Sequence, residues 1–225
     1  MARATLTLLQ SDAFTGAVTV QFHGVSAAQL SAIRHALQKD VPCLALAEVT
    51  LVKCDAVWGN EFIAQRIGTL PVSGAWALGE GDGDGAVFDV HVTAPPPSEA
   101  PCRYTTVTSK DFVLRRGADG AAPCASIVHS RTPAEAAVAP DGFQVVTLMP
   151  GQVFHAHARA QRATGRRDVR WKCAHVTQVS PHPECVLRVE TTGAVSATRA
   201  LHCALVATEQ RLREAARSLE GQETR

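Results

Sequence analysis

Two amphipathic segments, one near each end of the chain, constrain its fold more than any other feature. Both place apolar side chains at helical spacing, so each predicts a helix with one apolar stripe. The stripes consist of Leu30, Ile33 and Leu37 in the first segment and of Leu201, Leu205, Leu212 and Leu219 in the second. Because such a stripe must be buried against another element, we expect both helices to pack on neighbouring strands.

Alternating apolar residues predict strands beside both helices. Leu6 and Leu8, followed by Val18, Val20 and Phe22, predict a hairpin that leads into the first helix. The remaining expected elements are strands at 44–52, 145–148, 153–162 and 186–190, and a short helix at 57–68. Residues 114–142 are rich in alanine, glycine and proline and show little periodicity, so we expect an irregular excursion there.

This order of elements predicts an α+β fold with a discontinuous domain. We expect residues 3–44 and 144–225 to form that domain, because its strands and amphipathic helices lie at opposite ends of the sequence. Residues 45–143 are then expected to form an inserted mixed α/β domain.

Charge and hydropathy narrow the class of protein. The 225 residues include 22 lysines and arginines against 21 aspartates and glutamates, a formal net charge of +1. This balance gives no general electrostatic reason to bind nucleic acid, so we expect only indirect contact with it. The sequence shows neither a secretory signal pattern nor an apolar run long enough for a membrane span, so we expect an intracellular protein without a membrane partner.

Several short blocks, in the same order along the chain, resemble the alpha/D family of RNA polymerase assembly subunits. The block NEFIAQRIGTLPV at 60–72 is similar to a signature of the archaeal and eukaryotic members that bacterial alpha does not have. The other blocks are LSAIRHAL at 30–37, VP at 41–42, ALAEV at 45–49, VTSKDF at 107–112, LMPGQ at 148–152, GRRDVRW at 165–171 and ETTG at 190–193.

The resemblance implies a scaffold without an active site or cofactor of its own. The discontinuous domain would be a dimerisation domain that pairs with a small subunit of the archaeal L or eukaryotic eleventh-subunit type. The pair would then recruit the second-largest catalytic subunit and a small zinc-bearing adaptor. The protein would lie in the nucleus if the polymerase is eukaryotic and otherwise in the cytoplasm. A homodimer of the bacterial kind is the alternative within the family, although we expect no appended DNA-binding domain.

The resemblance also implies which residues meet partners. In the family, the last helix packs across a dimer seam, and the paired arginines of the first helix and the K-W segment lie where a large subunit docks. Carried onto this chain, the interface comprises Leu30, Ile33, Arg34, His35, Leu37, Glu61, Arg66, Arg170, Trp171, Leu201, Leu205 and Leu212.

Five positions depart from the family pattern: Ser31, His35, Asn60, Gln65 and Asp168. His35 stands where the family has its second arginine, so one permanent positive charge is lost there.

The seven cysteines include no C-x-x-C pair, so we expect reduced, mostly buried thiols. Some family members bind zinc or iron–sulfur clusters in the inserted domain. Here that region offers only Cys102 and Cys124, with His91 and His129 as the nearest supplements, so we expect no metal.

His155 and His157 leave an enzyme-class alternative open. Alternate residues of a strand point to one side, so the two imidazoles could bind a metal as in a cupin. A cupin also needs a nearby carboxylate, and this sequence has Arg159, Gln161 and Arg162 instead. Two surface histidines are therefore the favoured interpretation.

Overall fold

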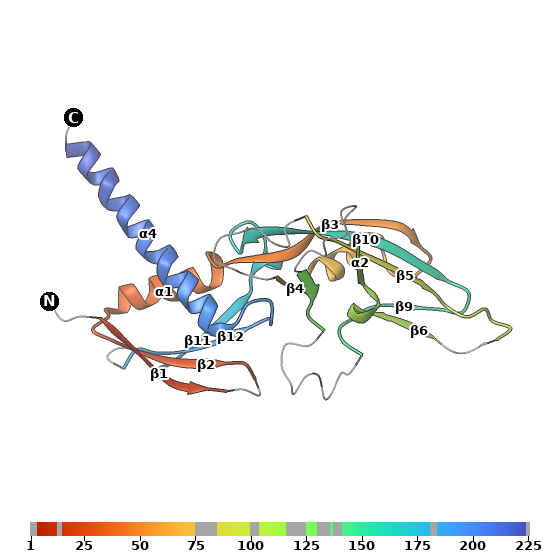
Figure 1. Ribbon diagram of the computed structural model, residues 1–225, viewed down its shortest axis with the longest axis horizontal. Coiled ribbons are helices and arrows are strands. Elements are labelled where there is room, and N and C mark those ends of the chain that lie inside the picture. The colour runs from red at the N-terminus through yellow and green to blue at the C-terminus, as the bar shows by residue number, and fades with distance from the viewer. Residues whose placement is uncertain are drawn as a thin grey trace. The chain divides into compact units, whose positions relative to one another are not determined.

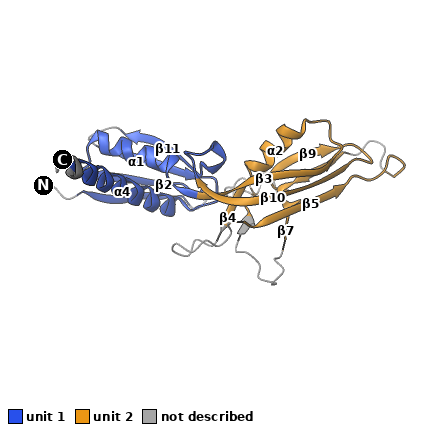
Figure 2. Ribbon diagram, turned by 90° about the horizontal axis from the view of Figure 1, so that it is seen from above, with its two compact units in different colours: residues 1–42, 164–225 blue, residues 43–163 orange. Residues whose placement is uncertain are grey.

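The computed structural model describes residues 4–12, 15–74, 85–99, 104–115, 125–129, 136, 141–180 and 184–223. The chain is a mixed α+β protein in which strands predominate (Figure 1). Its contacts divide it into two compact units, drawn in different colours in Figure 2. We call residues 1–42 with 164–225 the terminal unit and residues 43–163 the central unit.

The terminal unit has one antiparallel sheet and two long helices. The sheet order is β1-β2-β12-β11, and every neighbouring pair is antiparallel. The strands are β1 (Thr5–Ser11), β2 (Val18–His23), β11 (Ala174–Ser180) and β12 (Val186–Thr191), and the helices are α1 (Ala27–Lys39) and α4 (Ala197–Glu223). Helix α1 packs against α4 and β11, and α4 also contacts β12.

Local sequence explains where α1 begins and ends. Ser26 and Gln29 form a reciprocal capping box at its start, which satisfies backbone N–H groups that lack helical partners. Asp40 is the C-cap residue, and Pro42 lies just beyond it. The predicted stripe faces inward, with Leu30 and Leu37 buried. The prediction of this helix is therefore confirmed.

Helix α4 is confirmed as a single long helix. Ser196 precedes its first turn, where its side-chain oxygen accepts a hydrogen bond from Arg199 N. Leu201 and Ala204 are buried in the unit. Figure 1 shows the C-terminal part of α4 extending past the sheet and α1, and the side chains of Leu212 and Leu219 are exposed there.

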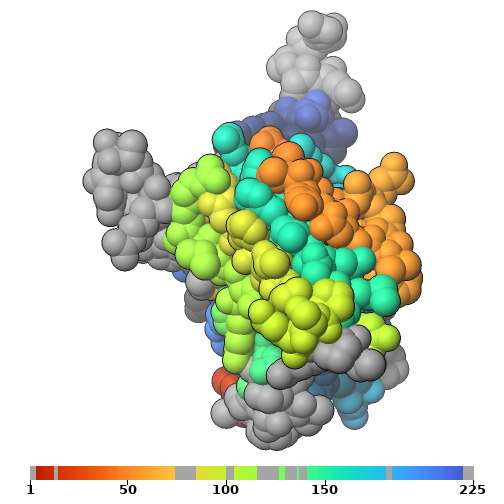
Figure 3. Space-filling view, turned by 90° about the vertical axis from the view of Figure 1, so that its right-hand side faces the viewer, coloured from red at the N-terminus to blue at the C-terminus, as the bar shows by residue number. Residues whose placement is uncertain are grey.

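The central unit is built on a six-stranded sheet with the order β7-β5-β10-β3-β4-β8. A second, two-stranded sheet joins β6 and β9, and helix α2 contacts β9. In Figure 3, β3, β10 and β5 run side by side in orange, teal and yellow. The elements are β3 (Pro42–Cys54), α2 (Asn60–Gly68), β4 (Pro71–Gly74), β5 (Val87–Thr93), β6 (Thr105–Thr108), β7 (Val113–Leu114), β8 (Ala125–Ile127), β9 (Gln144–Leu148) and β10 (Val153–Thr164).

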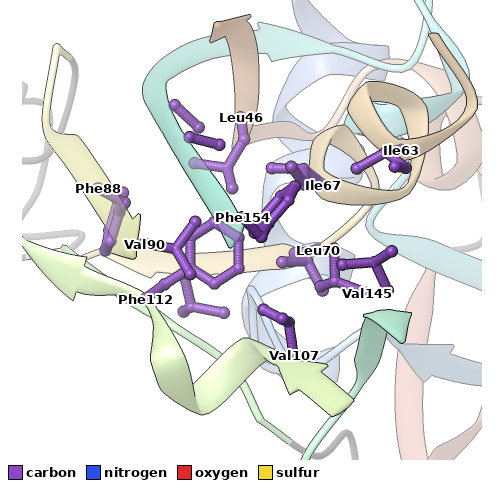
Figure 4. Close-up of a cluster of buried hydrophobic side chains, with 14 of the residues drawn as sticks. Leu46, Ile63, Ile67, Leu70, Phe88, Val90, Val107, Phe112, Val145 and Phe154 are labelled. Atoms are coloured by element: carbon purple, nitrogen blue, oxygen red, sulfur yellow. The ribbon is translucent and has the colours of Figure 1, made fainter. Parts of the chain in front are cut away.

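Phe154 lies at the centre of the core of the central unit. Figure 4 shows its ring between Leu46 and Ile67 on one side and Phe88 and Val90 on the other. Its side chain is completely buried. These residues come from β3, α2, β5 and β10, so one apolar cluster joins the helix to the sheet.

Two of the sequence blocks have structural roles. In VTSKDF, the side chain of Asp111 accepts a hydrogen bond from Thr108 N at 2.7 Å and caps a short 3-10 helix (Ser109–Asp111). In LMPGQ, Gly151 has a φ of 81°, a conformation that glycine adopts without strain, at the turn between β9 and β10. Both blocks therefore shape turns.

The central unit spans residues 43–163, whereas the inserted domain was expected at residues 45–143. We assigned residues 144–163 to the terminal strands, whereas β9 and most of β10 lie in the central unit. The reason is strand pairing, since β10 runs antiparallel to β5 from the Val153–Thr93 pair to the Arg159–Val87 pair. Most of the predicted excursion at 114–142, and the glycine-rich acidic segment at 79–84, lie outside the described residues. No helix in the described part of the chain is long and apolar enough to cross a membrane.

Candidate partner-binding surfaces

An apolar groove with a volume of about 760 Å³ runs through the terminal unit. Strands β1 and β2 line it together with α1 and α4. Three predicted interface residues meet there, namely Ile33 of α1 and Leu205 and Leu212 of α4. Leu212 is 65% exposed, so the groove offers an apolar surface without cover from the described residues.

Strand β1 extends this uncovered surface. Leu6 pairs with Phe22 and Leu8 with Val20, and paired residues of antiparallel strands share one face of the sheet. Val20 and Phe22 are buried, but Leu6 is 41% and Leu8 54% exposed. The inner face of β1 therefore carries leucines that no described element of the unit covers.

The other predicted seam leucines lie inside the unit. Leu30, Leu37 and Leu201 are buried in its own core and offer almost no surface to a partner. They hold the two helices that border the groove. Leu6 and Phe22 line the groove but were absent from the predicted interface. Their alternation in the sequence predicts a strand, but it does not show that one face of the strand stays exposed.

A second candidate surface surrounds the C-terminal end of α1. Arg34 and His35 are exposed there. The side chain of Asp40, which is largely buried, pairs with Arg166 Nε through one carboxylate oxygen and with Arg211 Nη2 through the other. This carboxylate therefore ties α1 to α4 and to the segment before β11.

The GRRDVRW block forms a cation–π cluster in the same unit. The guanidinium groups of Arg167 and Arg170 lie 5.0 Å and 5.6 Å from the ring centroid of the buried Trp171. Asp168 accepts a hydrogen bond from Arg170 N at 3.0 Å, and this bond is the main reason why the pKa of Asp168 lies below its usual value. Two predicted residues, Arg170 and Trp171, thus lie in one preorganised cluster.

Helix α2 presents a third surface, on the central unit. Trp58 and Phe62 stack with their ring centroids 5.3 Å apart, and the guanidinium of Arg66 lies 5.7 Å from the centroid of Phe62. Arg66 also donates a hydrogen bond to the carbonyl oxygen of Gln144 at 2.6 Å. Glu61 is exposed on the same helix. Exposed tryptophan and arginine are typical of interface hot spots, and the sequence blocks did not single out Trp58.

The metal-enzyme alternative finds little support in the central unit. His155 stacks on His91 with ring centroids 4.9 Å apart, and His157 pairs across the strands with Asp89. Asp89 is bound by Arg115 through two hydrogen bonds of 2.7 and 2.8 Å. Nowhere in the described residues do three histidine, cysteine, aspartate or glutamate side chains converge as metal ligands would.

The described cysteines Cys43, Cys54, Cys173, Cys185 and Cys203 are free thiols. Cys43, Cys173 and Cys185 are buried, as expected of small apolar side chains. Cys102 and Cys124 lie outside the described residues, so the expectation that the central region binds no metal stays a prediction.

The chain is similar to a known polymerase subunit. It is 28% identical over 150 residues to the DNA-directed RNA polymerase subunit Rpo3 of Methanothermobacter thermautotrophicus. The matched region covers 66% of this chain and 52% of that protein, so the chain spans about half the length of the relative. No protein-family model matches the chain. The similarity to Rpo3 supports the expected relationship to the alpha/D family, and the sequence identity is modest.

Proposed function

We propose that the chain is a non-catalytic assembly subunit of a DNA-directed RNA polymerase. The apolar groove of the terminal unit carries this proposal, because a surface of exposed leucines between two helices and a sheet edge calls for a partner. The similarity to Rpo3 supplies the class of complex. In this proposal, RNA synthesis belongs to other subunits, and contact with nucleic acid is indirect.

The occupant of the groove is a small L-like subunit. Leu205, Leu212 and Leu6 can form the apolar centre of such an interface, and obligate assemblies derive most of their binding energy from a buried apolar centre. The ion pair of Arg213 with Glu209, at 2.6 Å, lies among the groove-lining residues and supplies polar groups beside this centre.

The surface at the end of α1 receives the second-largest polymerase subunit. Arg34 is exposed on this surface, and the same unit carries the guanidinium groups of Arg167 and Arg170 that stack on Trp171. Guanidinium groups bind carboxylates well. The α2 surface around Phe62 and Arg66 is then available to the small zinc-bearing adaptor.

Arg34→Ala tests whether these surfaces act separately. Arg34 is exposed and does not line the groove, so the variant should keep its small partner and bind the second-largest subunit about tenfold more weakly. A pull-down that quantifies each partner separately checks this result. Arg217→Ala, at another exposed arginine outside the groove, should retain both partners. Loss of the small partner from Arg34→Ala would contradict the assignment of two surfaces.

A further inference from the structure

Ser109, in the VTSKDF block, is a completely buried polar residue of the central unit. Its hydroxyl oxygen lies 3.1 Å from Nδ1 of His129 and accepts a hydrogen bond from Phe143 N, also at 3.1 Å. Ser109 N in turn donates to the carbonyl oxygen of Phe143 at 2.8 Å. His129 follows β8 and Phe143 precedes β9, so one buried serine joins the 3-10 helix to the ends of two strands.

Gly142 shows how closely these segments pack. Its φ is 84°, and a Cβ atom at this position would lie 2.5 Å from Ser109 Oγ. The same atom would lie 3.4 Å from both Cβ and the carbonyl oxygen of His129. A larger residue would therefore force the serine and the histidine apart.

The contacts of Ser109 set the direction of its hydrogen bond to His129. Because the hydroxyl oxygen accepts from Phe143 N, its own hydrogen is available to donate, and Nδ1 of His129 is the acceptor that faces it. An Nδ1 that accepts carries no hydrogen, so the geometry requires a neutral imidazole with its hydrogen on Nε2. A protonated imidazole would bring a second donor to the hydroxyl and leave the buried hydroxyl hydrogen without this acceptor.

The charges around His129 act in the same direction. Burial, followed by the positive charge of Lys110, holds the pKa of His129 below its ordinary value. On the 3-10 helix, the carboxylate of Asp111 is bonded to the backbone N–H and the hydroxyl of Thr108. Asp141, beside Gly142, is exposed, and β4, β6, β8 and β9 carry no titratable side chain.

We propose that Ser109 and His129 form a pH-operated latch in the central unit, closed while His129 is neutral and opened by its protonation. The latch consists of the two side chains and the backbone of Phe143, and it does not depend on the proposed function. When it opens, the imidazole regains its ordinary pKa, so the open form binds more protons than the closed form.

The pH window follows from the lowered pKa. The closed form keeps its full stability above the ordinary histidine pKa of about 6.5 and loses stability as the pH falls from there through the pKa of His129 in the closed form. Since a single proton is involved, the open population should rise by at most about tenfold per pH unit.

Amide hydrogen exchange of the full chain, followed by NMR at about pH 7.5 and about pH 5.5, tests this proposal. After correction for the intrinsic exchange rate, the protection of the Phe143 amide should fall at the lower pH. The Ala160 amide, which donates to the carbonyl oxygen of Ala86 at 2.8 Å in the same unit, is the internal control and should keep its protection. Equal protection of Phe143 at the two pH values would overturn the proposal.

His129→Asn separates protonation from loss of the hydrogen bond. The asparagine side-chain oxygen can accept from Ser109 but does not titrate, so the protection of Phe143 should no longer depend on pH. His23→Asn is the matched control, because Nε2 of His23 lies 3.2 Å from the hydroxyl of Thr7 in an exposed pair of the terminal unit. This control should keep the wild-type pH dependence, whereas a His129→Asn variant that also kept it would contradict the latch.

The imidazole nitrogen resonances of His129 give a second readout. They should show the hydrogen on Nε2 at about pH 7.5 and a pKa below the ordinary histidine value. Ser109→Ala removes the hydroxyl that donates to Nδ1, so the pKa of His129 should rise in this variant. A neutral imidazole with its hydrogen on Nδ1 would overturn the proposal.

Discussion

Replacement of Leu212 by aspartate should weaken pairing with the small partner by at least about a hundredfold. Leu212 lines the groove and is exposed in the free chain, so the substitution should leave the fold almost unchanged. On pairing, its carboxylate would be buried against apolar groups without a partner, which costs several kcal/mol. Copurification of the two chains, followed by a titration of the affinity, measures the effect.

Val179→Asp is the matched control for this variant. Val179 is 59% exposed on β11 of the same unit and does not line the groove, so its replacement should leave pairing intact. Leu212 is a sharper test than Ile33, because Ile33 is buried and an aspartate there would also destabilise the unit itself. If Leu212→Asp pairs normally, the groove is not the seam.

Phe154→Ala should lower the free energy of unfolding by about 3–5 kcal/mol. The ring of Phe154 is fully buried where α2, β3 and β5 meet, so truncation removes apolar contacts and leaves a cavity. Denaturant unfolding followed by circular dichroism measures the loss. Val113→Ala, at an exposed residue of β7, should change stability by less than about 0.5 kcal/mol. A loss below about 1 kcal/mol for Phe154→Ala would show that this cluster is not the core of the central unit.

Periodicity in the sequence predicted the helices but not which of their leucines remain uncovered. Leu201 and Leu212 belong to the same apolar stripe, yet Leu201 is buried in the unit and Leu212 is exposed. The difference arises because α4 continues past the sheet, and the spacing of leucines carries no information on where that sheet ends. The exposed leucines of β1 were missed because alternation predicts a strand but does not show whether another element covers its face.

Strand patterns also could not assign strands to sheets. The alternation at 153–162 correctly predicted β10, but it fits any half-buried strand. Its pairing with β5, not its sequence, places it in the central unit. Strand β11 was not predicted at all, although Ala174 and Val176 alternate with exposed residues.

The sequence could not predict the charge cluster at the end of α1. Asp40, Arg166 and Arg211 are far apart along the chain and meet because the fold packs α1 against α4 and β11. The loss of an arginine at His35 could be seen in the sequence. The burial and the three cations that lower the pKa of its imidazole could not be seen there.

Copurification of a tagged copy of the chain from its native cell, followed by mass spectrometry, tests the central claim most directly. The account predicts recovery of a small L-like subunit, the second-largest subunit and the remaining subunits of an RNA polymerase. Recovery of the tagged chain without any polymerase subunit would contradict it.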